Sequence, residues 1–221
     1  MWAIVVAGGS GRRFGGPKQF LPLAGRPVAA WSVAAARTVA DGVVLVVPSG
    51  PDDAGSGDPD PDPRTMGADL VVTGGDTRSE SVRAGLSAVP DDASIIVVHD
   101  AARPLATGEL FASVVEAVRS SGVDGAIPVL PVADTLKRVA DGTVEQGVDR
   151  EGLVAVQTPQ AFVAATLRTA HRGAAEATDD AAMLEALGAT VRTVEGQPHN
   201  LKLTRPEDLV LAEALLGVSD R

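Results

Sequence analysis

The sequence of 221 residues contains no cysteine and no long, uninterrupted apolar run. Without cysteine the chain forms no disulfide, no zinc–thiolate site and no cysteine nucleophile. No stretch of 18 residues is free of polar interruption, so no membrane span is expected. A strand-like run begins at residue 2 and leaves no room for a secretory signal. We therefore expect a cytoplasmic location.

Acidic residues are missing from one part of the chain only. The net charge is −10, yet residues 1–40 hold five basic side chains and no acid, and the first acidic residue is Asp41. This overall acidity argues against a general nucleic-acid binder, which needs a basic face. An anionic ligand therefore requires a local positive site, and the N-terminal segment supplies the charge for one.

Short apolar runs alternate with amphipathic or Ala-rich segments along the chain. Strands are predicted at Trp2–Ala7, Val43–Val47, Leu70–Thr73, Ser94–Val98 and Gly125–Leu130. Helices are predicted at Val28–Val39, Ser79–Val89, Gly108–Ser121, Ala161–Arg172 and Asp180–Leu187, the last two ending at Gly173 and Gly188. This alternation predicts one α/β domain over residues 1–221, with a mostly parallel, Rossmann-like sheet and helices on both faces.

The last helix carries a start signal of its own. The sequence TRPE predicts Thr204 as the N-cap, Pro206 in the first turn and Glu207 as the partner that completes a capping box.

Two segments interrupt the alternation. Pro48–Thr65 is rich in Pro, Gly and Asp, which indicates a mobile surface loop without a chemical role. Residues 132–154 contain an Asp141–Gly142 turn between two polar–apolar stretches, which predicts a projecting β-arm. An arm that leaves its own domain must bury its apolar side elsewhere. We expect a partner subunit there, and hence a homodimer formed through the arm.

The glycine-rich segment AGGSGRRFGGPKQFL (Ala7–Leu21) follows the first predicted strand and contains five glycines and three cations. Such loops bring backbone N–H groups close to phosphates. A P-loop is excluded because Pro17 stands where its lysine belongs, and the dinucleotide fingerprint is broken by Phe14. The remaining chemistry is stabilisation of a phosphoryl group in transfer, with pyrophosphate as leaving group.

Several stretches together resemble the nucleotidyltransferases that activate sugar or polyol phosphates, most closely the 2-C-methyl-D-erythritol 4-phosphate cytidylyltransferase family. The stretches are GGSGRRFGGPKQF, VTGGDTRSESVRAGL, VVHDAARP, PVADTLKR, VDREGLVAVQTPQ, ATDDA and NLKLTRPEDL, in the order of the family. The resemblance covers nearly the whole chain. It implies an enzyme that joins CTP and 2-C-methyl-D-erythritol 4-phosphate into 4-diphosphocytidyl-2-C-methyl-D-erythritol and releases pyrophosphate, in non-mevalonate isoprenoid biosynthesis.

The resemblance also implies roles for individual residues. Catalytic roles fall to Lys18, Arg13 and Lys202, whose cations would face the triphosphate and the reacting phosphorus. Nucleotide contacts fall to Ala7, Gly8, Gly9, Gly11, Gly75, Asp76 and Ser81. Contacts to the polyol phosphate fall to Arg103, Thr135, Arg150, Thr158, Thr178 and Lys202, and for Thr178 N-capping of the next helix is an equal alternative.

Asp100 is the implied metal ligand, for Mg²⁺ or another divalent cation. It follows a predicted strand at the end where ligands bind in open α/β sheets. Mg²⁺ suits a single carboxylate because phosphate oxygens and water complete its coordination. A turn cap is the alternative role for this aspartate.

Three other functions stay open at this point. A cytidylyltransferase for ribitol 5-phosphate would share most of these motifs. A non-catalytic nucleotide-binding sensor could use the same fold, although the presence of Lys18, Arg13 and Asp100 counts against it. A nicotinamide oxidoreductase is disfavoured by the broken fingerprint.

Overall fold

A central eight-stranded β-sheet organises the chain in a computed structural model, which describes residues 1–8, 14, 17–48, 62–172 and 177–219. Its strands are β1 (Trp2–Val6), β4 (Gly42–Val47), β5 (Leu70–Thr73), β6 (Ile95–Asp100), β7 (Gly125–Pro131), β10 (Val154–Val156), β11 (Gln160–Val163) and β12 (Val191–Glu195). Their order is β10-β7-β11-β6-β1-β4-β5, and β12 also pairs with β7. Only β10 and β11 run antiparallel to their neighbours, so the predicted mostly parallel sheet is confirmed.

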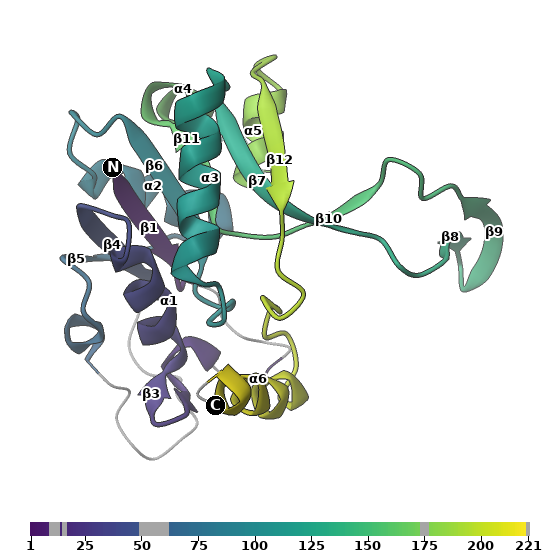
Figure 1. Cartoon of the computed structure of the whole chain (residues 1–221), viewed down its shortest axis with the longest axis horizontal. Helices are drawn as coiled ribbons and strands as arrows, with labels where there is room; N and C mark the ends of the chain where they lie inside the picture. Colours follow the sequence, from purple (N-terminus) through teal and green to yellow (C-terminus); the bar gives the residue numbers. More distant parts are fainter. Residues whose placement is uncertain (9–13, 15–16, 49–61, 173–176, 220–221) are drawn as a thin grey trace.

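Helices cover both faces of this sheet, as predicted (Figure 1). One face carries α1 (Val28–Arg37) and α3 (Gly108–Ser121), and the other carries α2 (Arg78–Ala88), α4 (Ala164–Ala170) and α5 (Asp180–Glu185). Successive strand residues point to opposite faces, so in β1 Val5 joins the core under α1 and α3 while Ile4 joins the core under α2. Gly85 lets α2 approach closely, because a Cβ there would lie 2.5 Å from a methyl group of Ile4.

A third, smaller apolar cluster joins the two ends of the chain. The last helix, α6 (Glu207–Ser219), packs near the short strands β2 (Pro22–Leu23) and β3 (Arg26–Pro27), which follow the 3-10 helix η1 (Lys18–Phe20). The buried residues of this cluster are Leu23, Val28, Leu105, Leu203 and Ala212.

One predicted helix start and one predicted helix cap are wrong. Ala161–Val163 belong to β11 rather than to a helix, because they pair between β6 and β7, with Ala161 and Phe162 fully buried. Burial and sheet pairing here override the helical preference of an Ala-rich segment. The capping box expected from Glu207 is also wrong. The Asp208 carboxylate instead accepts hydrogen bonds from the Thr204 and Arg205 backbone N–H groups and from the Thr204 hydroxyl.

Glycines were predicted to end the two helices that precede α6. Gly188 follows α5 with φ +73°, the left-handed conformation expected of a glycine that ends a helix. Gly173 lies outside the described residues. None of the helices in the described part of the chain has the length and apolar character that a membrane crossing needs.

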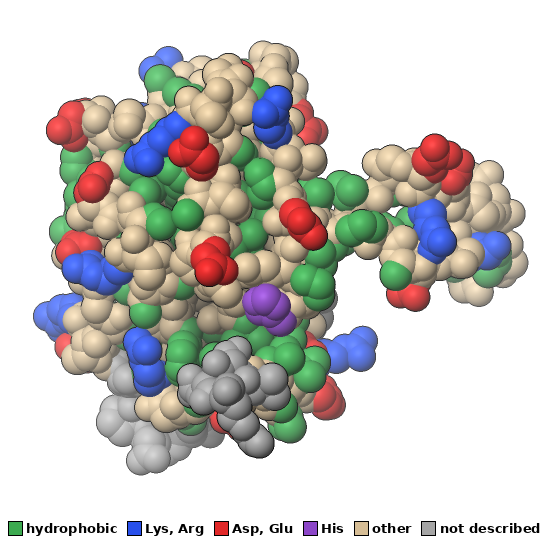
Figure 2. Space-filling model, viewed as in Figure 1, with side chains coloured by type: hydrophobic (Ala, Val, Ile, Leu, Met, Phe, Trp, Pro, Cys, Tyr) green, Lys and Arg blue, Asp and Glu red, His purple; other side chains and the backbone are tan. Residues whose placement is uncertain are grey.

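The predicted β-arm is present and stands clear of the main body (Figures 1 and 2). Strands β8 (Leu136–Ala140) and β9 (Thr143–Val148) pair antiparallel across the Asp141–Gly142 turn, where both residues have positive φ. Of the segment expected to be a mobile loop, Pro63–Thr65 instead belong to a second 3-10 helix, η2 (Pro63–Met66), whose Met66 is buried. Residues 49–61 lie outside the description.

Candidate active site

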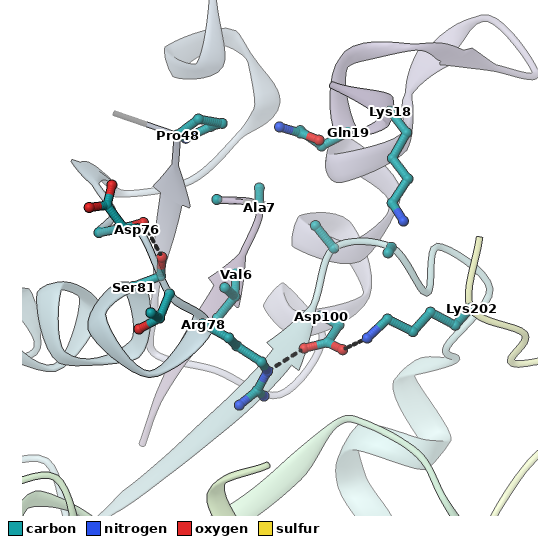
Figure 3. A pocket seen from close by; sticks show the side chains of 15 residues that line it. Val6, Ala7, Lys18, Gln19, Pro48, Asp76, Arg78, Ser81, Asp100 and Lys202 are labelled. Carbon is teal, nitrogen blue, oxygen red and sulfur yellow. Dashed lines mark hydrogen bonds and ion pairs between the residues drawn. The ribbon is translucent and has the colours of Figure 1, made fainter. Parts of the chain in front are cut away.

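A cavity of about 660 Å³ opens at the carboxyl ends of the parallel strands (Figure 3). After β1 the chain adds β4 and β5 on one side and then β6 on the other, so the strand order reverses at β1. This reversal is where open α/β sheets bind ligands. Eight of the residues predicted for nucleotide, metal or catalysis line this one cavity: Ala7, Gly8, Lys18, Gly75, Asp76, Ser81, Asp100 and Lys202. Pro48, from the segment expected to have no chemical role, lines it as well.

Glycines bring the first loop and the start of α2 together around Ser81. A Cβ on Gly8 would lie 2.8 Å from the Ser81 hydroxyl oxygen, and one on Gly74 would lie 2.5 Å from it. The start of α2 is fixed by a capping box, in which the Thr77 hydroxyl and the Glu80 carboxylate each accept a backbone N–H. The floor of the cavity is therefore preformed backbone that only glycine allows.

Asp100, at the end of β6, lies between two cations in this cavity. Its carboxylate accepts from Arg78 Nε at 3.0 Å and from Lys202 Nζ at 2.7 Å. Burial alone would raise the pKa of Asp100, but attraction to Arg78 and Lys202 outweighs it and holds the pKa well below its ordinary value. Asp100 is therefore an ionised carboxylate at neutral pH.

Asp100 also fits the expected magnesium ligand in chemical type. Its hard carboxylate oxygens suit Mg²⁺, which commonly takes one or two protein carboxylates and completes its shell with phosphate and water. Among the described residues no three His, Asp or Glu side chains come together as a metal cluster. A metal at Asp100 would consequently depend on oxygens that a bound phosphate brings.

Arg78 is the main site residue that sequence reasoning missed. It is the first residue of α2, lies between the predicted contacts Asp76 and Ser81, and lines the cavity. A signal was available, since a cation in the first turn of a helix is disfavoured by the helix dipole. Its place there indicates that another interaction compensates, and that interaction is the ion pair with Asp100. Gln19, which is buried and lines the cavity, was missed as well.

Lys18 extends from η1 toward the Asp100–Lys202 pair (Figure 3). Its ammonium group donates to the Leu203 carbonyl and lies 5.7 Å from the centre of the Phe14 ring. The predicted cation of the N-terminal segment thus reaches the same cavity as Asp100. Arg13, Gly9 and Gly11 lie outside the described residues, so their predicted roles stay predictions.

A second cavity, of about 280 Å³, adjoins the first and shares Arg78, Asp100 and Lys202 with it. Its lining adds three residues predicted to contact the polyol phosphate: Arg103, Thr158 and Thr178. The described residues predicted to contact the nucleotide and these three predicted to contact the polyol phosphate therefore lie in two neighbouring cavities that meet at Asp100.

The Thr158 hydroxyl takes part in a buried network beneath this junction. It accepts from the Asp100 backbone N–H at 3.1 Å and donates to His99 Nδ1 at 3.1 Å, while His99 Nε2 donates to the Arg103 carbonyl at 3.2 Å. Burial lowers the pKa of His99 to about 4, so the ring is neutral and can accept at Nδ1. Thr158 thereby fixes the backbone that carries Asp100, in addition to lining the second cavity.

Two further residues of the second cavity also have defined surroundings. The Arg103 guanidinium donates to the Asn200 carbonyl at 2.8 Å, and burial lowers its pKa while Asp100 opposes this. The N-capping alternative for Thr178 is wrong, because the Asp179 carboxylate caps α5 by accepting from the Ala182 N–H at 2.9 Å. Thr178 itself is exposed at the cavity.

Thr135 and Arg150 are not brought to these cavities within one chain. Both belong to the arm, where Arg150 donates to the Ala133 carbonyl and lines a separate cavity of about 550 Å³ at the base of the arm. Apolar side chains near that base are exposed, with Leu153 at 43% and Val154 at 44%.

A cation-lined cavity at the switch point of a mostly parallel sheet, joined to a smaller cavity lined by Arg78, Arg103 and Lys202, is the arrangement expected of a nucleotidyltransferase-type α/β protein. The family model of 2-C-methyl-D-erythritol 4-phosphate cytidylyltransferase matches residues 1–218. The chain belongs to this family.

Relatives and solved structures agree with this membership. The chain is 45% identical over 228 residues to the 2-C-methyl-D-erythritol 4-phosphate cytidylyltransferase of Frankia casuarinae, covering 99% of this chain and 82% of that protein. It is 44% identical over 223 residues to a bifunctional enzyme IspD/IspF of Granulibacter bethesdensis, covering 98% of this chain and only 56% of that protein. A crystal structure of the cytidylyltransferase from Thermus thermophilus superposes with a TM-score of 0.80 at 38% identity, covering 96% of this chain and 97% of that one.

Proposed function

We propose that this protein transfers the cytidylyl group of CTP to 2-C-methyl-D-erythritol 4-phosphate and releases pyrophosphate. The observation that carries the proposal is the junction of two cavities at Asp100, with Arg78 and Lys202 shared between them. The larger cavity has the volume for a nucleotide and the smaller one suits a polyol phosphate. The family's relatives bear the name of this activity.

The chemistry asks the protein to align two anions. An oxygen of the polyol phosphate attacks the α-phosphorus of CTP, a new P–O bond forms, and the bond to the bridging oxygen breaks as pyrophosphate leaves. A phosphate monoester has a second pKa near 6, so the attacking oxygen is largely ionised at neutral pH and no general base is needed. Lys18, Arg78 and Lys202 offset the repulsion between the two substrates and stabilise the charge that builds on the phosphorus oxygens.

We further propose that Asp100 holds a magnesium ion during turnover. A bound Mg²⁺ neutralises phosphate charge and orients the phosphates for in-line displacement. Asp100 would contribute the carboxylate, and Arg78 and Lys202 hold that carboxylate ionised and in place. Removal of divalent ions with EDTA should abolish turnover, and retained turnover would contradict the assignment.

The test of function is a product assay with both candidate acceptors. Purified protein, CTP and Mg²⁺ are incubated with either 2-C-methyl-D-erythritol 4-phosphate or ribitol 5-phosphate, and the nucleotide product is identified by mass spectrometry. We expect product and pyrophosphate with the methylerythritol substrate. Preference for ribitol 5-phosphate would support that alternative, and tight CTP binding without any product would support a nucleotide sensor.

We also propose that the active unit is a homodimer in which the arm of one chain completes the site of the other. Support comes from the exposed apolar residues near the base of the arm and from Arg150, whose arm lies clear of the body of its own chain (Figure 1). In such a dimer Thr135 and Arg150 would face the partner's polyol phosphate. A cytoplasmic location likewise stays a prediction.

Mixing two impaired variants, assayed at a polyol-phosphate concentration well below the raised KM of Arg150→Ala, tests the shared site. In a hybrid of Lys18→Ala and Arg150→Ala chains, one site lacks both residues and the other keeps both. Random re-assortment should therefore restore about a quarter of wild-type activity. No recovery after verified exchange of chains would contradict a site built from two chains.

A further inference from the structure

Behind the junction of the two cavities lies a buried carboxylate that neither cavity exposes. Asp180, the first residue of α5, is 1% exposed, and its Oδ2 lies 2.8 Å from Arg78 Nη1. Its other oxygen, Oδ1, lies 2.9 Å from Nε2 of His171, which is also buried. Oδ1 therefore has a hydrogen-bond partner, while Oδ2 pairs with Arg78 by charge without the geometry of a hydrogen bond, and Arg78 is a residue of the site.

Arg78 thus spans two carboxylates with two different nitrogens. Its Nη1 faces Asp180 while its Nε donates to Asp100 at 3.0 Å. Burial acts to lower the pKa of Arg78, but the charges of Asp180 and then Asp100 more than compensate and raise it. A hydrogen bond to Asp100 on one side and the charge of Asp180 on the other restrict rotation of the planar guanidinium, so its direction toward Asp100 is restrained.

Asp180 itself is held on a rigid support. The preceding residue, Asp179, caps α5 by accepting from the Ala182 N–H at 2.9 Å. Its second oxygen accepts from Gln160 Nε2 at 3.1 Å, and Gln160 is a buried residue of β11 in the central sheet. The start of α5 is therefore tied to the sheet, and Asp180 takes its place from that tie.

The geometry points to Asp180 as a positioning residue, which holds Arg78 so that its guanidinium orients the Asp100 carboxylate at the junction of the two cavities. The negative charge of Asp180 also balances the positive charge of Arg78. Asp100 and Asp180 face Arg78 and Lys202, two acids against two bases. Without Asp180, Arg78 would pair with Asp100 alone and pull that carboxylate out of its orientation. His171 in turn fixes the direction of Asp180.

The first experiment measures the variant Asp180→Asn, which keeps the shape of the side chain and removes its charge. Isothermal titration with CTP counts the binding-competent sites, and kcat for cytidylyl transfer is expressed per competent site. We expect kcat per site to fall about 10- to 100-fold, the scale for displacing a site residue by about 1 Å. The matched control Asp92→Asn, at an exposed acid, should keep wild-type values. If competent sites are lost while kcat per site is unchanged, Asp180 has only a structural role and the inference is overturned.

A comparison of two variants that both lack Arg78 covers the case in which Asp180→Asn fails to fold. Arg78→Gln and the double variant Arg78→Gln/Asp180→Asn differ only at Asp180, and the double variant places two neutral amides where the ion pair was. Because Asp180 acts through Arg78, we expect the two to agree in kcat per site within about twofold. A clearly lower kcat per site in the double variant would show that Asp180 acts by another route and would overturn the inference.

The kinetic experiments rest on the proposed function. A measurement of hydrogen exchange distinguishes failure of this inference from failure of that function. In protein labelled with ¹⁵N-arginine, the Arg78 Nε–H resonance is assigned by its absence in Arg78→Gln. Its exchange with solvent should be slow in the wild type and at least about tenfold faster in Asp180→Asn. Unchanged protection would overturn the positioning role in an active enzyme. A wild type without turnover would instead overturn the function, and the exchange rate would then decide the inference alone.

Discussion

The hydroxyl group of Thr158 gives the sharpest stability prediction. In the variant Thr158→Val a methyl group replaces the hydroxyl with little change of shape. The hydroxyl joins two buried groups, because it accepts from the Asp100 N–H and donates to His99 Nδ1. Thr158 is 5% exposed and His99 is fully buried, so water cannot replace either bond without a rearrangement.

The expected magnitude follows from the two groups left without a partner. A buried donor or acceptor that loses its partner costs about 1–3 kcal/mol, so two of them should lower the free energy of unfolding by about 2–6 kcal/mol. For a chain of this size, that corresponds to a drop in Tm of about 4–24 °C. The control Thr158→Ser keeps the hydroxyl and removes one methyl group, for which about 1 kcal/mol is expected.

Urea denaturation followed by circular dichroism, with differential scanning calorimetry alongside, measures both variants against the wild type. The comparison is made at pH 7.5, where His99 is neutral in both the folded and the unfolded chain. If Thr158→Val loses no more stability than Thr158→Ser, the hydroxyl does not hold the Asp100 backbone, and the network described for it is refuted.

Three further predictions concern charge and pH. Lys18→Ala should lower kcat by about 10²–10³, the range for one charge-stabilising donor, and near-normal turnover would remove Lys18 from the chemistry. Arg150→Ala should raise the KM for the polyol phosphate and leave the Kd of CTP, measured by titration, nearly unchanged; an equal loss for both ligands would argue against its place on the acceptor side. Because burial lowers the pKa of His99 to about 4, the unfolded chain takes up a proton below about pH 6.5 while the folded chain does not. Stability should therefore fall by about 1.4 kcal/mol per pH unit between pH 6.5 and 4 relative to His99→Gln, and parallel urea-denaturation profiles for the two proteins would contradict this.

Much of the fold was predictable because most of its strands and helices carry a local sequence signal, such as an apolar run or a capping residue. The helix Gly108–Ser121 was predicted at its observed ends, since Thr107 caps it and Gly122 ends it with positive φ. The strand β11 was not, because its Ala-rich sequence takes its form from pairing between β6 and β7. Long-range pairing leaves no short-range pattern, which is also why β12 was missed.

The residues of the site also divide into those with a local sequence signal and those set by long-range contacts. Gly8, Lys18 and Asp100 could be singled out because loop composition and a strand end mark them, while their roles came from the family resemblance, and these three residues line one cavity. Arg78 and Asp180 could not be paired from the sequence, since they lie about a hundred residues apart and meet only because α2 and α5 cover the same face of the sheet. The buried role of the Thr158 hydroxyl was hidden for the same reason.

One feature of the fold links the far end of the chain to its chemistry. The Lys18 ammonium rests on the carbonyl of Leu203, and Leu203 sits in the apolar cluster that α6 closes through Ala212. The final helix therefore serves as an anchor for a cation nearly two hundred residues earlier, although α6 contributes no wall to the nucleotide cavity. Removing α6 is therefore expected to loosen the backbone that receives the Lys18 ammonium.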